Sequence, residues 1–134
     1  MKRIKIYKNK SFKKKTGILI PVNFDKKYPI HPKRIFFIYG KRNAIRGDHA
    51  HKKCSQFFYC LSGKILIKID NLKKKYNYIL DNVSNKSLLI PAKHWCSVKF
   101  LEKKSLVMVI CDRYYEYNDY IHSYKEFKKY LTKR

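Results

Sequence analysis

Two histidines, His49 and His51, stand two residues apart in the segment 46–53, which reads RGDHAHKK. On a β-strand, side chains at this spacing point to the same face, with Cα atoms about 7 Å apart. Two imidazoles on one face can bind a metal ion or move protons, because histidine titrates near neutral pH. Arg46 and Gly47 before the pair favour a tight chain path there over the alternative, a solvent-exposed polar loop.

A metal site would need further ligands at a suitable spacing. Metal-binding cupins combine an H-x-H pair with a glutamate, then a glycine that closes a hairpin, and a third histidine in a later strand. This chain has Gln56 in place of the glutamate, followed by Gly63, and His94 comes later. Glutamine is a neutral, weak ligand that does not balance the charge of a divalent ion. We expect a cupin-like scaffold without a metal, and a metal-dependent cupin is the alternative.

Without a metal, two inward-facing imidazoles suit general acid–base catalysis. A neutral histidine can take a proton from a carbon next to a carbonyl group, and a proton can be returned to the neighbouring atom. Aldose–ketose and keto–keto isomerisations proceed in this way.

The elements that must position these residues are short strands. Alternating or short apolar runs predict strands at 4–6, 17–20, 34–39, 56–61, 64–69, 76–80, 87–90, 96–100 and 105–111. Turn residues recur about every ten positions, which favours an all-β sandwich or barrel over alternating βα units. Ser62-Gly63 between two strand-like runs predicts a β-hairpin.

One helix is expected at the C-terminal end. Ser123 and Glu126 have the spacing of a capping box, with Ser123 as the N-cap. Tyr124, Phe127 and Leu131 then fall on one face. We expect this helix to act as a lid on the barrel.

Length and composition limit the class of protein. The 134 residues (16.3 kDa) suffice for one domain, 1–134, and 45% hydrophobic residues exclude a disordered chain. No apolar run reaches the roughly 18 residues of a membrane span, and residues 1–10 do not resemble a signal peptide. We therefore expect a cytoplasmic protein without a membrane partner. The four cysteines lack a C-x-x-C spacing and are expected to be free thiols.

The charge is strongly positive, with 33 Lys and Arg against nine Asp and Glu, a net charge of +24. Such a charge favours anionic partners, among them nucleic acid, anionic lipid and phosphorylated small molecules. The excess is mostly lysine spread along the whole chain, which is typical of an AT-rich genome, and we prefer this compositional explanation. We expect no nucleic-acid partner. A basic module that combines stacking rings with a cationic groove is the alternative, and salt-resistant binding to oligonucleotides would support it.

Three segments, 34–38 (RIFFI), 46–52 (RGDHAHK) and 61–63 (LSG), resemble the dTDP-4-keto-6-deoxyglucose 3,4-ketoisomerases. The segments 114–121 (YYEYNDYI) and 127–130 (FKKY) are similar to that family too, so the resemblance spans almost the whole chain. It implies a cupin or jelly-roll barrel and a homodimer with exchanged N-terminal strands. It also implies a dTDP-linked keto sugar as substrate, no metal or other cofactor, and a role in making 3-amino-3,6-dideoxy sugars of bacterial surface glycans.

By the same resemblance, His49 and His51 are the catalytic pair. They would remove the C-3 proton, pass through an enediol or enediolate and protonate C-4, and the order of the two histidines stays open. Arg46 and Arg34 are candidates for contacts to the pyrophosphate, since a planar guanidinium binds phosphate oxygens in a bidentate manner. The alternative for Arg34 is a solvated side chain at a strand edge.

Gln56 and Lys52 complete the predicted substrate-binding residues. Gln56 would point into the same cavity and hydrogen-bond the sugar, or else be a core glutamine bonded to the backbone. Lys52 belongs to the RGDHAHK motif.

The chain departs from the family pattern at three places. Thr16 stands where the family usually has an arginine, and phenylalanines at 36–37 stand where it often has tyrosines. His94 precedes Trp95, whereas the family has Trp-His. On a regular strand this swap would turn the His94 imidazole outward, unless a bulge follows Pro91. A related sugar-nucleotide-binding cupin with altered or lost catalysis is therefore the second hypothesis.

Overall fold

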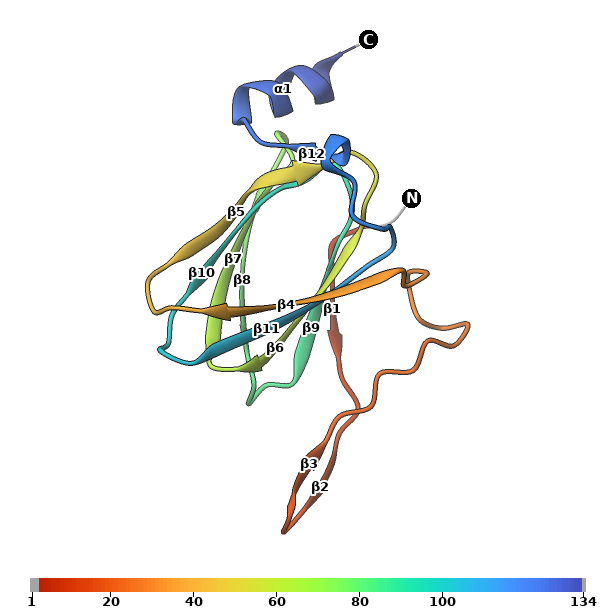
Figure 1. The fold of residues 1–134 in the computed structure, drawn as a ribbon, viewed down its shortest axis with the longest axis vertical. Helices are drawn as coiled ribbons and strands as arrows, with labels where there is room; N and C mark the ends of the chain where they lie inside the picture. The colour runs from red at the N-terminus through yellow and green to blue at the C-terminus, as the bar shows by residue number, and fades with distance from the viewer. Residues whose placement is uncertain (1–2, 134) are drawn as a thin grey trace.

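Two five-stranded antiparallel sheets face each other in the computed structural model, which describes residues 3–133 (Figure 1). The first sheet has the order β1 (Lys5–Lys8), β9 (Lys86–Ile90), β6 (Gln56–Ser62), β11 (Ser105–Cys111) and β4 (Arg34–Gly40). The second has the order β12 (Tyr120–Ile121), β5 (Ile45–His51), β10 (Trp95–Phe100), β7 (Lys64–Asp70) and β8 (Lys75–Asp81). Apart from β7 and β8, neighbouring strands in these two sheets are not consecutive in the chain, as in a jelly roll. The expected all-β cupin or jelly-roll barrel is confirmed.

An apolar core fills the space between the sheets. Ile65, Ile67 and Ile69 of β7 point into it and are at most 2% exposed. The β6 strand is buried on both faces: Phe58 lies in this core, whereas Phe57 lies on the outer face under Ile30 of the N-terminal segment. Double-sided burial explains why the β6 sequence is continuously apolar instead of alternating.

The Ser62-Gly63 pair does not close a hairpin, so this prediction is wrong. The strands on either side of it, β6 and β7, belong to different sheets, and Gly63 turns the chain from one sheet to the other. Gly63 has a φ of +78°, and a Cβ there would lie 2.5 Å from Ser105 Oγ. Glycine is thus required both by the backbone conformation and by the close approach of β11. In local sequence a corner between sheets resembles a hairpin turn.

A small hairpin of β2 (Phe12–Lys14) and β3 (Gly17–Leu19) projects from the barrel at the end opposite the C-terminal helix (Figure 1). Every residue of both strands is exposed, including Phe12 (59%), Ile18 (61%) and Leu19 (61%). An isolated two-stranded hairpin is only marginally stable in water. Its apolar side chains are therefore a candidate contact surface.

The C-terminal helix, α1 (Tyr124–Thr132), begins as predicted. Ser123 Oγ accepts a hydrogen bond from the Glu126 backbone N–H at 3.1 Å. Phe127 is fully buried against Ala50 of β5 and Ile121 of β12, so the helix caps one end of the barrel. It does not line the interior cavity and is not a lid over it. Among the described residues, no helix has the length and apolar character needed to cross a membrane.

Candidate active site

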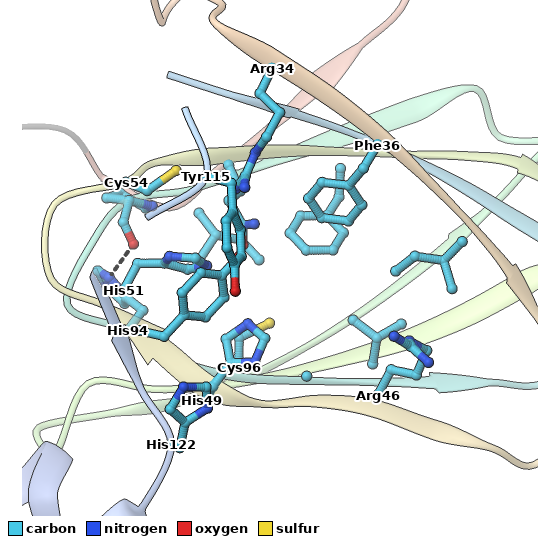
Figure 2. Close-up of a pocket in the computed structure, with 18 of the residues that line it drawn as sticks. Arg34, Phe36, Arg46, His49, His51, Cys54, His94, Cys96, Tyr115 and His122 are labelled. Atoms are coloured by element: carbon cyan, nitrogen blue, oxygen red, sulfur yellow. Dashed lines mark hydrogen bonds between the residues drawn. The ribbon is translucent and has the colours of Figure 1, made fainter. Parts of the chain in front are cut away.

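A cavity of about 420 Å³ opens inside the barrel, between the two sheets (Figure 2). Strands β4, β5, β6 and β10 line it, together with the loop before β10 and the C-terminal segment around the 3₁₀ helix Tyr117–Asp119. It brings together five predicted site residues: Arg34, Arg46, His49, His51 and Gln56. A cavity of this size is within the usual range for small-molecule sites.

A β-bulge in β5 places its functional side chains on one face. The pairing with β10 runs from Cys96 opposite His49 to Ser97 opposite Gly47, so Asp48 is an extra residue. Gly47 has a φ of +90° and Asp48 a φ of +50°, the left-handed conformations that such a bulge uses. Arg46 and His49 are an odd number of positions apart and would face opposite sides of a regular strand. The bulge brings both to the cavity. The sequence predicted a tight chain path at Gly47, but not the bulge.

His51 is held by a carboxylate that the sequence did not reveal. Its Nδ1 lies 2.9 Å from Asp119 Oδ2, and both side chains are about 6% exposed. Asp119 also accepts backbone N–H bonds from Lys53 at 2.7 Å and from Cys54 at 3.3 Å. An acceptor at Nδ1 fixes the proton there, so His51 Nε2 carries a free lone pair. That Nε2 atom is buried and without a hydrogen-bond partner.

Both histidines are held neutral. Burial, and next the neighbouring His51, lower the pKa of His49 to about 4. Burial also lowers the pKa of His51, although the hydrogen bond to Asp119 opposes this effect. The two rings meet edge to face, with centroids 5.2 Å apart, and each also contacts the Tyr120 ring. A neutral imidazole that lies beside a carboxylate is suited to accept a proton.

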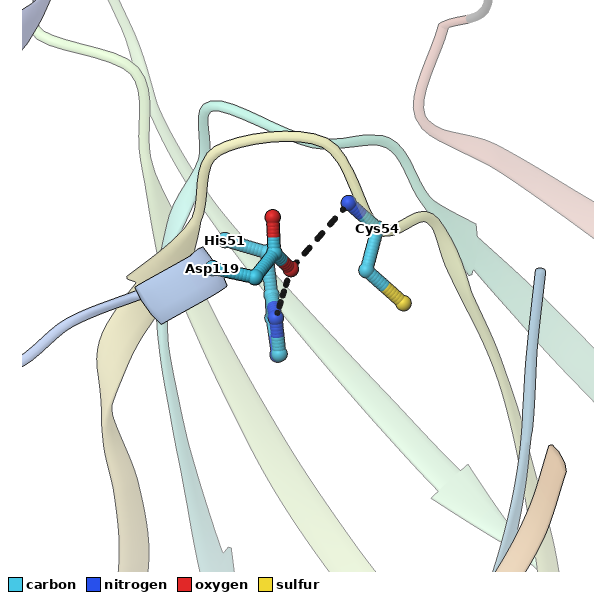
Figure 3. A group of neighbouring side chains, drawn as sticks. All are labelled: His51, Cys54 and Asp119. Atoms are coloured by element: carbon cyan, nitrogen blue, oxygen red, sulfur yellow. Dashed lines mark hydrogen bonds and ion pairs between the residues drawn. The ribbon is translucent and has the colours of Figure 1, made fainter. Parts of the chain in front are cut away.

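The His51, Cys54 and Asp119 side chains gather a nitrogen, a sulfur and an oxygen within 4.8 Å of one another (Figure 3). A metal ion there would compete with the three hydrogen bonds that Asp119 already accepts. The Cys54 thiol is also a poor ligand, because its hydrogen bond to Cys111 and its burial raise its pKa. The donor set suits a hydrogen-bonded His–Asp dyad better than a metal site. The absence of a metal in the working protein stays a prediction.

Arg34 reaches the cavity from β4 (Figure 2). Its Cζ lies 5.6 Å from the Phe36 ring centroid and 5.5 Å from that of Tyr115, and its Nη2 lies 3.5 Å from Cys111 Sγ. Arg34 Nε is buried without a partner. In the described part of the chain, Arg34 Nε and His51 Nε2 are the two buried side-chain polar atoms left unpaired. Because buried polar groups are normally paired, two such atoms in one cavity indicate a polar ligand.

The other predicted substrate contacts differ in their position relative to the cavity. Gln56 is 7% exposed, lines the cavity and directs Nε2 to Cys111 Sγ at 3.7 Å. Arg46 is exposed, at the edge of the cavity. Lys52 does not line the cavity; it lies in a separate groove beside α1, with Nζ 5.9 Å from the Tyr130 ring centroid. The structure therefore does not bring Lys52 to the other site residues.

His94 lies at the cavity wall, contrary to the expectation that the His94-Trp95 order would turn it outward. Lys93 has a φ of +67°, and its N–H donates to the His51 carbonyl at 2.7 Å, which turns the chain just before β10 begins at Trp95. Trp95 instead packs against Phe127 of α1 on the outside. A left-handed turn in the loop thus brings His94 to the cavity wall, which we expected only a bulge to do.

Three residues of the C-terminal segment that were not predicted as site residues belong to the site. Asp119 is hydrogen-bonded to His51, and the Tyr120 ring contacts both histidines of β5. The His122 ring stacks on the Tyr120 ring, with centroids 5.7 Å apart. β12 sets them in place, since Tyr120 pairs with His51 in the β12–β5 ladder. The motif at 114–121 was the one signal for them, and it did not indicate which of its side chains turn inward.

Comparisons with known proteins point to one family. The model of the family described as FdtA, WxcM-like, C-terminal, matches residues 2–132. The chain is 32% identical over 118 residues to the curated TDP-4-oxo-6-deoxy-alpha-D-glucose-3,4-oxoisomerase of Aneurinibacillus thermoaerophilus, covering 87% of this chain and 84% of that one.

Solved structures agree with this match. WlaRA, a TDP-fucose-3,4-ketoisomerase from Campylobacter jejuni, has a TM-score of 0.86 and 33% identity, over 98% of this chain and 97% of its own. A histidine-to-asparagine variant of the 3,4-ketoisomerase QdtA from Thermoanaerobacterium thermosaccharolyticum, in complex with TDP-4-keto-6-deoxyglucose, has a TM-score of 0.89 and 25% identity. The match covers 98% of this chain and 95% of that one.

Proposed function

Since the chain belongs to the FdtA, WxcM-like, C-terminal family, we propose that it converts dTDP-4-keto-6-deoxyglucose to a dTDP-3-keto-6-deoxyhexose. It is a sugar-nucleotide 3,4-ketoisomerase, and thus an isomerase that moves a carbonyl group between neighbouring carbons. The observation that carries the proposal is the His51 imidazole. Its Nδ1 is bound to Asp119, and its Nε2 is buried and unpaired in the cavity.

The free Nε2 lone pair makes His51 the base that removes the proton from C-3 of the sugar. The carbonyl at C-4 makes this proton acidic, and the Asp119 carboxylate stabilises the imidazolium that forms. The product of this step is an enediolate shared by C-3 and C-4. The His51–Asp119 pair supports a mechanism in which His51 acts first.

The second half of the reaction returns a proton to C-4, while the C-3 hydroxyl gives up its proton and becomes the carbonyl. The oxygen on C-4 gains a proton, so the number of protons on the sugar is unchanged. His49, neutral and 5.2 Å from His51 between ring centroids, is placed to relay these protons. The enediolate and both histidines would thus stay within one cavity.

Arg34, Gln56 and Arg46 bind the remainder of the substrate. Arg34 has an unpaired Nε donor and Arg46 lies at the cavity edge, which suits both for the pyrophosphate oxygens. Gln56, buried deeper, is suited to hydrogen-bond a sugar hydroxyl. Tyr115, exposed at the cavity wall, offers a ring for the nucleotide base.

The working form is a homodimer with exchanged N-terminal strands, in keeping with the resemblance. The exposed apolar residues of the β2–β3 hairpin support it, and so do Ile35 (46%), Phe37 (53%) and Tyr39 (82%) on the outer face of β4. A second copy would cover both surfaces.

The four cysteines are free, which fits the cytoplasmic location that we propose. The product would supply 3-amino-3,6-dideoxy sugars of surface glycans.

Proton NMR of dTDP-4-keto-6-deoxyglucose incubated with the purified protein tests the function. The spectrum should show loss of the C-3 proton signal and growth of a 3-keto sugar, and protein treated with a metal chelator should give the same rate. An unchanged substrate spectrum would refute the proposed function.

A further inference from the structure

The Cys111 sulfur lies at the centre of a hydrogen-bond cluster beneath the cavity. Cys111 is fully buried at the end of β11. It pairs with Arg34 of β4 on one side and with Gln56 of β6 on the other. The side chains follow the same arrangement: Arg34 Nη2 lies 3.5 Å from Cys111 Sγ and Gln56 Nε2 lies 3.7 Å from it. One sulfur therefore accepts hydrogen bonds from two of the proposed substrate contacts.

Cys54, in the loop between β5 and β6, is the other neighbour of Cys111. Its interaction with Cys111, together with the Arg34 and Gln56 donors, holds the pKa of Cys111 below the ordinary thiol value of 9.0 despite its burial. The same interaction and burial raise the pKa of Cys54, whose Sγ donates a hydrogen bond to the Ser55 carbonyl oxygen at 3.4 Å. Cys111 is the thiol that ionises, because Arg34 and Gln56 both point to it.

The other cysteines show what burial does without such donors. Burial raises the pKa of both Cys60 and Cys96 to about 12. A buried sulfur is thus uncharged by default, and the surroundings of Cys111 reverse this. The groups that face Cys111 are Arg34 from β4, Gln56 from β6, Cys54 from the loop, and Tyr120 from β12 through its bond to Arg34. Two nearby carboxylates, Asp112 and Asp119, act on Cys54.

We propose that the Cys111 sulfur, present as a thiolate, is the buried counter-anion that positions Arg34 and Gln56 for substrate binding. This inference rests on the proposed function, in which Arg34 and Gln56 bind the sugar nucleotide. Cys111 does not touch the substrate and undergoes no covalent change; it is a positioning residue. Arg34 lines the cavity, and with Nη2 held by Cys111 its buried and unpaired Nε is the donor left for a substrate oxygen.

The thiolate itself is testable in the free protein, without substrate. Thiolates absorb in the ultraviolet where thiols do not, so absorbance should rise in a step with a midpoint well below the ordinary thiol pKa of 9.0. The Cys111→Ser variant should lack the step, and Cys60→Ser, which removes another buried thiol, should keep it. Cys54→Ala removes the neighbouring thiol that helps to lower the pKa of Cys111 and should shift the midpoint upward. A wild-type protein without the step, or a step that persists in Cys111→Ser, would overturn the inference.

Steady-state kinetics test the positioning role. Cys111→Ser should raise KM about tenfold, the usual scale for loss of a hydrogen bond to a charged group, with a much smaller effect on kcat. Cys111→Asp restores an anion, and its KM should lie between the raised value of Cys111→Ser and the wild-type value. A folded Cys111→Ser variant with wild-type KM would contradict the role. If the absorbance step is present but the wild-type protein does not turn over the keto sugar, the proposed function is wrong, whereas the ionised state of Cys111 is still confirmed.

Discussion

At the scale of single residues, the proposed chemistry depends on the His51–Asp119 dyad. A hydrogen bond of 2.9 Å joins the two side chains, and through it Asp119 would orient the ring and stabilise its protonated form. Neither partner is exposed enough for water to replace the other. The dyad is therefore expected to behave as one catalytic unit.

Asp119→Asn should lower kcat by roughly tenfold to a thousandfold, because the amide keeps one acceptor but removes the charge that stabilises imidazolium. KM should change little, since Asp119 is not a proposed substrate contact. Asp48→Asn removes an exposed carboxylate from β5 and is the matched control, with kcat close to wild type. Wild-type kcat in Asp119→Asn would show that the dyad has no catalytic role.

The pH dependence follows from the lowered pKa values of both histidines. kcat should stay level from about pH 8 through the ordinary histidine pKa of about 6.5, and fall only in more acidic solution, because His49 and His51 remain neutral. In the unfolded chain the same histidines bind protons near 6.5, so the free energy of unfolding should decrease as pH falls below this value. Urea unfolding at several pH values measures this. A kcat that halves near pH 6.5 would contradict the assignment.

The histidine pair was predictable from its spacing, and its carboxylate partner was not. His51 and Asp119 are 68 positions apart, and only the β12–β5 pairing brings them together. The same holds for Cys111, whose partners lie on β4 and on β6. Local sequence shows which residues share a strand face, but not which strands become neighbours.

At the scale of elements, irregular backbone sets the site. The bulge in β5 turns Arg46 and His49 to the same side, and the turn at Lys93 brings His94 to the cavity wall. Gly47 indicated a tight chain path in the sequence but not a bulge, and Lys93 gave no sign of a left-handed turn. The hairpin expected at Ser62-Gly63 was wrong for a similar reason, because a sheet corner and a hairpin use the same residues.

Gly47→Ala should both destabilise the protein and reduce its activity. The φ of +90° is strained for any residue with a Cβ, and that Cβ would lie 3.0 Å from the Cys96 carbonyl oxygen. The strain should cost about 1–3 kcal/mol in the free energy of unfolding. kcat should fall as well, because relief of the strain displaces His49. Urea denaturation and turnover measure the two effects, and a variant with wild-type values of both would show that the bulge does not require glycine.

At the scale of the whole molecule, the projecting hairpin and the outer face of β4 expose apolar side chains that the proposed homodimer would cover. Sedimentation at micromolar concentration should show a homodimer. A double variant, Ile18→Lys with Leu19→Lys, should shift the protein to monomer, because it places two charges on the apolar hairpin. Lys13→Ala on the same hairpin is the control and should remain dimeric. A monomeric wild-type protein would remove the dimer from the proposal.

The most direct test of the central claim compares the wild-type protein with His51→Asn. Each is incubated with dTDP-4-keto-6-deoxyglucose in D₂O, and the C-3 proton signal is followed by NMR, with binding measured separately. Wild-type protein should remove the C-3 proton, and His51→Asn should bind the substrate but remove this proton about 10²–10⁴ times more slowly. Loss of the C-3 proton at the wild-type rate in His51→Asn would contradict the assignment of His51 as the base.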